Sequence, residues 1–286
     1  VDFGGNHTVV KEQHELAREA EAVGVAIVPD TGLTPGLAGV LVAGGVRALD
    51  RAEAAEIRVG GLPQDPRPPL DYALLFSVRG LTNEYLEPSV VLHEGRVETR
   101  PGLGGLETLQ FHGAVYEAFY TSGGVSTLPE TFGDRLRELD CKTIRYPGHA
   151  EKMNLLRELG FFREEPVETG GVKVAPRRVL EALLERVLPH DVPDVTLLRV
   201  RVTGGKDGRK AAAVYEMVDR YDEVEGFTSM QRCTAWPGTV ILRMILTGEI
   251  RERGVLFQEL SVDPDRLIAE LAERGIRIEF RLETGG

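Results

Sequence analysis

The sequence predicts an α/β segment followed by a larger α+β region whose sheet is mixed or largely antiparallel. Strand and helix patterns alternate over residues 1–50, which is the order of a parallel sheet. A stretch rich in proline and glycine at 56–70 then interrupts this order. Beyond it, short alternating strands and hairpins are separated by amphipathic helices. We therefore expect segments at 1–55, 56–225 and 226–286.

The first segment reads as strand, helix, strand and helix. "VDFGGN" (1–6) resembles the end of a strand, so we expect further residues upstream. A helix is predicted over 9–23, with Thr8 as its N-cap and Gly24 closing it. "VAIVP" (25–29) is typical of a buried strand, and residues 35–49 form an apolar, glycine-rich helical pattern.

In the second segment, residues 56–70 are interpreted as a crossing or linker. Strands and hairpins are predicted at 72–78, 88–100 and 107–113, and a long hairpin at 194–221 turns at Gly204–Gly208. Helices are expected at 148–160, 175–188 and 263–275, the last with Asp263 as N-cap. The strongly apolar helix at 234–250 is expected to be buried between layers and to return towards the first segment.

Composition narrows the function class. The chain has 286 residues, is 42% hydrophobic and carries a net charge of −11, with no basic cluster that would favour nucleic acid. Its two cysteines lie in no CxxC pair and are too few for a disulfide framework. No apolar run is long enough to cross a membrane, and no signal peptide is visible. These features favour a cytoplasmic globular protein that binds neither nucleic acid nor membrane.

"IVPDTGLTPGL" (27–37) places two prolines and two glycines where a predicted strand ends and a helix begins. Ligands bind at the carboxyl ends of parallel strands. Gly32 and Gly36 would let backbone face a ligand, while Pro29 and Pro35 fix the path. An ordinary strand-to-helix turn would have the same composition, and the glycines of "VDFGGN" leave the same two interpretations open.

"KTIRYPGHAEKM" (142–153) is the richest polar stretch. Arg145 and Tyr146 precede a predicted helix that begins near His149 and includes Lys152. Arginine can bind a carboxylate with two hydrogen bonds, and histidine or lysine can move protons. Arg79 and the hydroxyl-rich loop at 119–132 are further candidates. Each candidate has a structural alternative. Residues 142–153 would then be a surface junction, Arg79 would form a surface ion pair, and 119–132 would be a solvated loop.

Several common site motifs are missing from the sequence. Residues 1–286 contain no GxGxxG after a strand, no Walker motif and no GxSxG elbow. No two of the six histidines have metal-ligand spacing. We therefore expect no metal site.

Five motifs together resemble the saccharopine dehydrogenase-like family, and lysine 6-dehydrogenases in particular. They are "VDFGGN…VPDTGLTPGL", "FSVRGLTNEY", "EAFYTSGGVSTLP", "KTIRYPGHAEKM" and "GTVILRMILTGEI…GVLFQELSVDP". The resemblance implies a Rossmann domain, of which this chain would hold only the last part, followed by an α+β domain. It also implies NAD or NADP as cofactor, a small amino-acid substrate and a homodimer.

The resemblance also implies roles for individual residues. The nicotinamide would lie on the first segment, contacting Gly4, Gly5, Asn6, Pro29, Gly32, Leu33, Pro35 and Gly36. The substrate would face Arg79, Tyr120, Thr121, Arg145 and Tyr146. Oxidation of a C–N bond needs a proton acceptor, for which Asp30 and His149 are the candidates and Lys152 is a weaker one. The alternatives are a saccharopine dehydrogenase-type enzyme acting on another amine and a non-catalytic ligand-binding or oligomerisation module.

Overall fold

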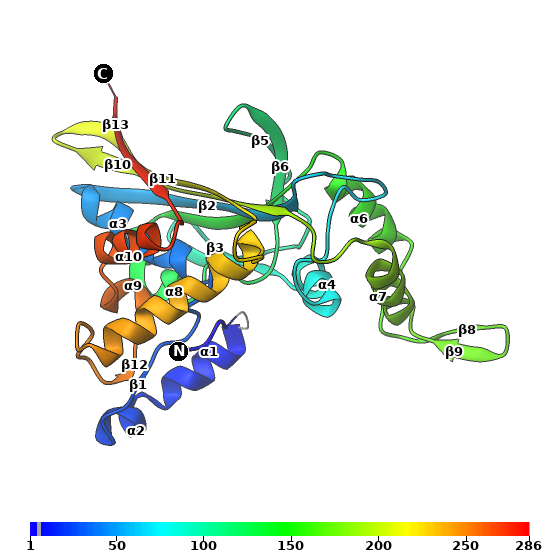
Figure 1. Cartoon of the computed structure of the whole chain (residues 1–286), viewed down its shortest axis with the longest axis horizontal. Coiled ribbons are helices and arrows are strands. Elements are labelled where there is room, and N and C mark those ends of the chain that lie inside the picture. Colours follow the sequence, from blue (N-terminus) through cyan, green and yellow to red (C-terminus); the bar gives the residue numbers. More distant parts are fainter. Residues whose placement is uncertain (5–6, 286) are drawn as a thin grey trace.

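The computed structural model describes residues 1–4 and 7–285. In this part of the chain, nine strands form one mixed sheet across the molecule (Figure 1). Its main path is β13 (Ile278–Thr284), β11 (Arg209–Arg220), β10 (Asp194–Lys206), β2 (Arg51–Pro63), β7 (Glu138–Arg145), β3 (Ser89–His93) and β4 (Arg96–Arg100). From β7 the sheet also extends through β6 (Ala114–Tyr120) to β5 (Glu107–Phe111). Only β2 and β7 pair in parallel within this sheet, so the predicted mixed sheet is confirmed.

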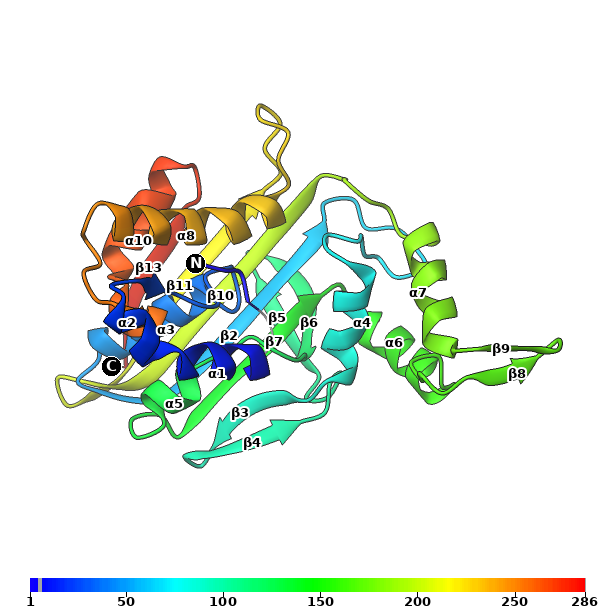
Figure 2. The same ribbon diagram turned by 90° about the horizontal axis from the view of Figure 1, so that it is seen from below.

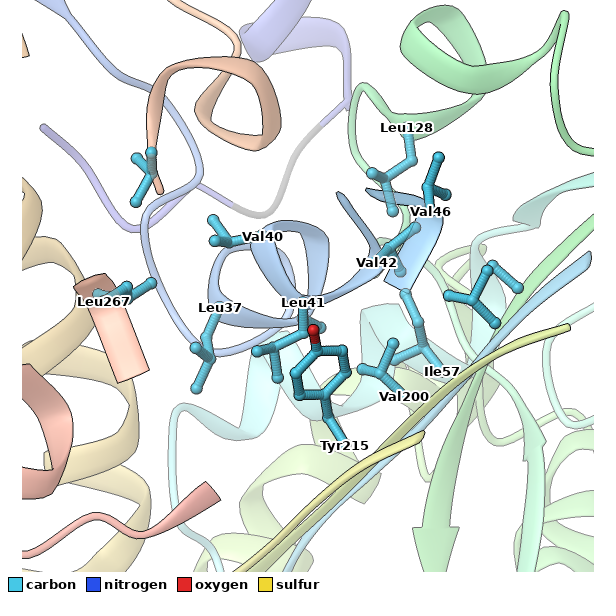
Figure 3. Close-up of a cluster of buried hydrophobic side chains, with 14 of the residues drawn as sticks. Leu37, Val40, Leu41, Val42, Val46, Ile57, Leu128, Val200, Tyr215 and Leu267 are labelled. Carbon is cyan, nitrogen blue, oxygen red and sulfur yellow. The ribbon is translucent and has the colours of Figure 1, made fainter. Parts of the chain in front are cut away.

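Helices cover one face of the sheet (Figure 1). They are α3 (Leu37–Ala48), α5 (Leu128–Phe132), α8 (Ser229–Leu246), α9 (Gln258–Ser261) and α10 (Pro264–Glu273). Apolar residues of α3 such as Leu41 pack on Ile57, Val200 and Tyr215 of three adjacent strands (Figure 3). All four of these side chains are buried. Burial of a large apolar side chain contributes roughly 1.5–3 kcal/mol, so this cluster fixes α3 and the loop before it.

The N-terminal layer lies beyond these helices (Figure 1). It contains α1 (His7–Glu15), α2 (Ala17–Ala22) and the parallel strands β1 (Ala26–Ile27) and β12 (Gly254–Val255). Asp2 runs beside β1, because its N–H donates to the Val28 carbonyl and its carbonyl accepts from the Thr31 N–H. The single helix predicted over 9–23 is wrong, since it is divided at Leu16 and Thr8 lies within α1. Gly24 does end α2 with a positive φ, as predicted.

A second group of helices lies at the other end of the sheet (Figures 1 and 2). It consists of α4 (Val78–Leu86), α6 (His149–Glu158) and α7 (Pro176–Val187). They share a separate apolar cluster that includes Tyr72, Leu81 and Leu180. The hairpin of β8 (Val167–Thr169) and β9 (Val172–Val174) projects from this group.

The structure corrects three further predictions of secondary structure. The linker interpretation of 56–70 is wrong for its first half, because Glu56–Pro63 belongs to the central strand β2. The strand predicted at 72–78 is instead a loop that is buried at 72–74 and exposed at Phe76, and Ser77 then caps α4, which begins at Val78. The apolar helix at 234–250 begins earlier, at Ser229, and is not buried all round, since Leu246 is 77% exposed.

Predictions that relied on local patterns are confirmed. The hairpins β3–β4 and β10–β11 form as expected, as do α6, α7 and the Asp263-capped α10. None of the helices in the described residues combines the length and the apolarity that crossing a bilayer requires.

Candidate active site

A cleft of about 710 Å³ opens between the N-terminal layer and the sheet. On one side lies the segment 29–36, which we call the ledge; it contributes Gly32, Leu33, Thr34 and Pro35, next to Phe3 and Gly4. Opposite it are the ends of β2 and β7, one face of α4 and the loop 121–124. The first turns of α8 complete the wall. The cleft therefore brings together segments that are far apart in the sequence.

The floor of the cleft is the parallel pair β2 and β7, near the carboxyl end of each strand. Val59 pairs with Thr143, which sets Gly60 and Gly61 beside the last residues of β7. A side chain at Gly60 would lie 2.5 Å from the Ile144 carbonyl oxygen, and one at Gly61 would meet Met230 and Leu75. Glycine is thus needed for close packing here, and both glycines line the cleft.

Arg145 ends β7 and lines this floor. Its Nη1 donates to the Ile144 carbonyl at 3.0 Å, and its guanidinium lies 4.6 Å from the centre of the Tyr72 ring. Its Nη2 is 3.6 Å from Glu84 Oε2. The residue is 2% exposed, and its Nε has no hydrogen-bond partner among the described residues. A buried cation with an unused donor beside a cleft is suited to a carboxylate.

Helix α4, together with the residue that follows it, presents residues at helical spacing to the cleft. These are Gly80, Asn83, Glu84 and Glu87, at positions i, i+3, i+4 and i+7. Asn83 is held in place by Arg177, whose Nη2 donates to Asn83 Oδ1 at 2.5 Å. Because that oxygen accepts from Arg177, the amide nitrogen remains as a donor towards other partners.

Burial raises the pKa of Glu84 to about 7, with Arg145 acting in the opposite direction. Its side chain is 29% exposed overall, but its Oε2 is buried and has no hydrogen-bond partner in the part of the chain described here. The charged form of this carboxyl is thus poorly solvated. Groups with such shifted pKa values are concentrated at functional sites.

Of the ledge residues that line the cleft, Gly32 has no side chain, whereas Leu33, Thr34 and Pro35 each contribute one. A side chain at Gly4 would overlap the carboxylate of Asp30, and Gly36 has a φ of 134°. Thr31 Oγ1 donates to the Asp2 carbonyl at 2.6 Å, and Gln258 donates to the Asp30 carbonyl at 2.6 Å. These bonds fix the path of the ledge. Thr34 Oγ1 is buried there without a hydrogen-bond partner within the described residues.

Two predicted proton acceptors do not line the cleft. Asp30 is 3% exposed, and its carboxylate accepts a hydrogen bond from Ser126. His149 is 1% exposed, with Nε2 bonded to the Tyr85 hydroxyl at 2.9 Å and Nδ1 to the Leu70 carbonyl at 3.1 Å. Burial, followed by Arg145, lowers the pKa of His149 to about 3. Both side chains are engaged in structural contacts, and Lys152 is paired with Asp71 at 3.1 Å.

Three predicted substrate contacts also lie elsewhere. Arg79 pairs with Glu164 at 2.7 Å and with Glu181 at 3.3 Å. Tyr120 lies on the opposite side of the sheet, under Lys142 and 3.4 Å from Asp140. The Tyr146 hydroxyl donates to the Pro63 carbonyl at 2.9 Å. None of the three lines the cleft.

The remaining predicted residues divide between the cleft and its surroundings. Thr121 lines the cleft, and its hydroxyl lies 2.7 Å from that of Thr143. Gly4, Gly32, Leu33 and Pro35 also line it, whereas Pro29 and Gly36 do not. Gly5 and Asn6 lie outside the described residues. Sequence reasoning missed Tyr72, Asn83, Thr143 and the cleft-facing role of Glu84.

Residues 32–276 match the saccharopine dehydrogenase C-terminal domain family. This chain belongs to that family. The described residues contain no cluster of histidine, cysteine, aspartate or glutamate side chains that could hold a metal ion.

Solved structures show the same fold at low sequence identity. Saccharopine dehydrogenase (L-Glu forming) from Saccharomyces cerevisiae, in its apo form, superposes with a TM-score of 0.75 at 19% identity, covering 95% of this chain and 77% of the yeast protein. Homospermidine synthase from Legionella pneumophila, solved in complex with NAD, gives a TM-score of 0.61 at 11% identity. That match covers 98% of this chain and 67% of the other.

Proposed function

We propose that this member of the saccharopine dehydrogenase C-terminal domain family is an NAD(P)-dependent oxidoreductase acting on a C–N bond of an amino acid. The reaction we propose is that of a lysine 6-dehydrogenase, the oxidative deamination of lysine. The observation that carries the proposal is the position of Arg145. Its buried guanidinium, with an unused Nε donor, lies in the same cleft as the ledge.

The ledge fits a nicotinamide ring on two grounds. Gly4 and Gly32 offer backbone without side-chain bulk, so a flat ring can approach closely. The buried Thr34 hydroxyl has no hydrogen-bond partner among the described residues and could bond the ring's carboxamide. The NAD in the structurally similar homospermidine synthase supports the same choice of cofactor. When bound, the cofactor would accept a hydride, and the protein supplies binding and orientation.

Arg145 would hold the substrate carboxylate through charge-assisted hydrogen bonds. Asn83 would donate a further hydrogen bond, and the Thr121–Thr143 hydroxyl pair offers a polar contact on the same floor. Holding the substrate carboxylate on Arg145 and the cofactor on the ledge sets the distance between the reacting carbon and the nicotinamide. The reacting nitrogen must be a neutral amine before hydride can leave its carbon. The resulting iminium ion is then hydrolysed or captured within the molecule.

The first test is a substrate panel. The purified full-length protein is assayed with L-lysine, saccharopine and carboxynorspermidine, each with NAD⁺ and NADP⁺, by following reduced nicotinamide at 340 nm. Reduction that depends on lysine is the expected result. Turnover of another amine would correct the substrate. Cofactor binding by calorimetry without any turnover would favour a non-catalytic module.

A second prediction concerns the ledge. Thr34→Val keeps the shape of the side chain but removes the hydroxyl that we assign to the carboxamide. Loss of one hydrogen bond costs about 0.5–1.5 kcal/mol, so the Kd for the cofactor is expected to rise by roughly 2- to 12-fold. Calorimetric titration with NADH measures it. Thr239→Val, on the exposed side of α8, is the matched control. An unchanged Kd in the Thr34 variant would contradict this contact.

We further propose a cytoplasmic homodimer, on the basis of the family resemblance in the sequence. Sedimentation equilibrium of the purified chain at several concentrations tests the dimer. A single species with the mass of one chain at all concentrations would exclude it.

A further inference from the structure

Amine oxidation at this site needs a proton acceptor within the cleft. Asp30 and His149 lie outside the cleft lining and are bonded to protein groups. A group that receives the proton of the substrate ammonium must instead face the space between Arg145 and the ledge. Among the carboxyl groups of the described residues, only Glu84 and Glu87 line the cleft.

Glu84 differs from Glu87 in its surroundings. Its Oε2 is buried, has no hydrogen-bond partner in the described part of the chain and lies 3.6 Å from Arg145 Nη2. Glu87 follows the last residue of α4 and is exposed. A buried carboxylate oxygen that accepts no hydrogen bond costs free energy unless a ligand supplies one. Its position in the cleft beside the carboxylate-binding arginine shows where that ligand would be.

We propose that Glu84 is the residue that accepts the proton from the substrate ammonium. This rests on the proposed function, because it assigns a role within that reaction. With the lysine carboxylate on Arg145, the ε-ammonium, which carries the reacting nitrogen in the proposed reaction, would donate a hydrogen bond to Glu84 Oε2. Glu84 is then a catalytic residue that contacts the substrate directly.

The proposed step balances as follows. The N–H bond of the ammonium breaks, its proton forms an O–H bond with Glu84, and the electron pair stays on nitrogen as a neutral amine. The adjacent carbon then loses a hydride, with two electrons, to the oxidised nicotinamide that the proposed function supplies. The nitrogen lone pair forms the C=N bond, giving an iminium ion. Glu84 finally returns its proton to solvent.

Electrostatics supports this direction of transfer. Glu84 interacts electrostatically with Arg145 and Cys141 of β7, with Tyr72 of the preceding loop and with Tyr85 of its own helix, and Glu87 lines the same cleft. Burial raises its pKa to about 7 despite the attraction of Arg145. A substrate carboxylate on Arg145 would offset the attraction of that arginine, whereas the substrate ammonium, as long as it keeps its proton, favours the charged form of Glu84. A pKa near 7 leaves Glu84 partly ionised at neutral pH and still able to bind a proton more readily than an ordinary glutamate.

The test compares Glu84→Gln and Glu84→Asp with the wild type across pH 5.5–9. For the wild type we expect kcat/KM to rise with pH and level off above about 7, because the ionised Glu84 is the acceptor. Glu84→Gln is expected to lower kcat by roughly 10²- to 10⁴-fold and to abolish this inflection. Glu84→Asp should keep the inflection with a reduced kcat. Glu87→Gln, a matched loss of charge from the same side of the cleft, should keep it as well.

A readout independent of turnover accompanies the kinetics. Carbon-13 spectra of protein labelled at the glutamate side-chain carboxyl should contain a resonance that titrates near pH 7 and is absent in Glu84→Gln. Addition of L-lysine should move that titration to lower pH, because the bound ammonium favours the charged form of Glu84. Titration of Glu84 at the ordinary value for glutamate would overturn the proposal whatever the kinetics.

The kinetic outcomes separate the two proposals. Turnover of the wild type combined with an unchanged kcat and pH profile in Glu84→Gln overturns the role of Glu84 alone. Absence of turnover with every amine of the panel and both cofactors overturns the proposed function, and the role of Glu84 with it. Loss of kcat and of the inflection in Glu84→Gln, with the resonance near pH 7, supports both.

Discussion

Replacing Arg145 by methionine is expected to lower kcat/KM for the amino-acid substrate by at least about 100-fold. Two charge-assisted hydrogen bonds to a carboxylate contribute roughly 1.5–3 kcal/mol each, and a factor of ten corresponds to about 1.4 kcal/mol. Methionine fills much of the same space against Tyr72, so packing of the buried site is largely kept. Steady-state kinetics with the substrate identified in the panel measures the effect.

Arg145→Lys is the control that separates charge from geometry. Lysine keeps the positive charge but not the planar pair of donors, so an intermediate loss is expected. Urea unfolding of each variant shows whether the fold is retained. A methionine variant that folds and has unchanged kinetic constants would exclude Arg145 from substrate binding.

The period of a β-strand explains why the polar stretch at 142–153 was only partly understood from the sequence. Alternate residues of a strand face opposite sides. Cys141, Thr143 and Arg145 all face the cleft, whereas Lys142 and Tyr146 face away from it. Sequence reasoning grouped Arg145 with Tyr146 because they are adjacent. Strict use of the two-residue period would have separated them.

The sequence did not predict Glu84 as a cleft residue because helix α4, whose period of about 3.6 residues brings it to the cleft, was not predicted. Residues 72–78 were predicted as a strand because a short buried apolar run does not reveal its own secondary structure. Ser77, three residues before Gly80, was the available signal for a helix start, and its hydroxyl does accept from the Gly80 N–H. With α4 assigned, the spacing of Gly80, Asn83, Glu84 and Glu87 would have predicted a polar face.

Two features could not be predicted from neighbouring residues in the sequence: the structural contacts of Asp30 and His149, and the close packing at Gly60 and Gly61. Asp30 and His149 were chosen as polar residues near glycine-rich turns, but their partners Ser126 and Leu70 lie 96 and 79 residues away in the sequence. Likewise, Gly60 and Gly61 looked like strand breakers because nothing local reveals that β7 and Met230 approach them. Contacts between distant segments decide both cases, whereas hairpins and amphipathic helices follow from local pattern.

Replacing Arg177 by methionine is expected to give the largest loss of stability among the changes considered. Arg177 is 4% exposed and donates to Thr82, Asn83, Glu181 and Glu164, which joins α7 to α4. Removing one partner of a buried ionic network costs about 3–5 kcal/mol, because the remaining charged groups stay buried away from water and no longer have an opposite charge beside them. Urea or thermal unfolding monitored by circular dichroism measures the change.

Arg79→Met provides a matched control, since Arg79 pairs with the same two glutamates from a position that is 52% exposed. Exposed ion pairs contribute about 0–1 kcal/mol, so its loss should be small. If both variants lose the same amount, burial is not the cause.

Arg177 should also affect the site through Asn83. Its guanidinium accounts for the orientation of the Asn83 amide, so the folded Arg177→Met variant should show a raised KM for the amino acid. Because Arg177 does not line the cleft, the pH dependence that we attribute to Glu84 should persist in this variant. A shifted inflection would instead show that α4 has moved relative to Arg145. The stability of the second helical group and the geometry of the cleft are thus linked through one buried arginine.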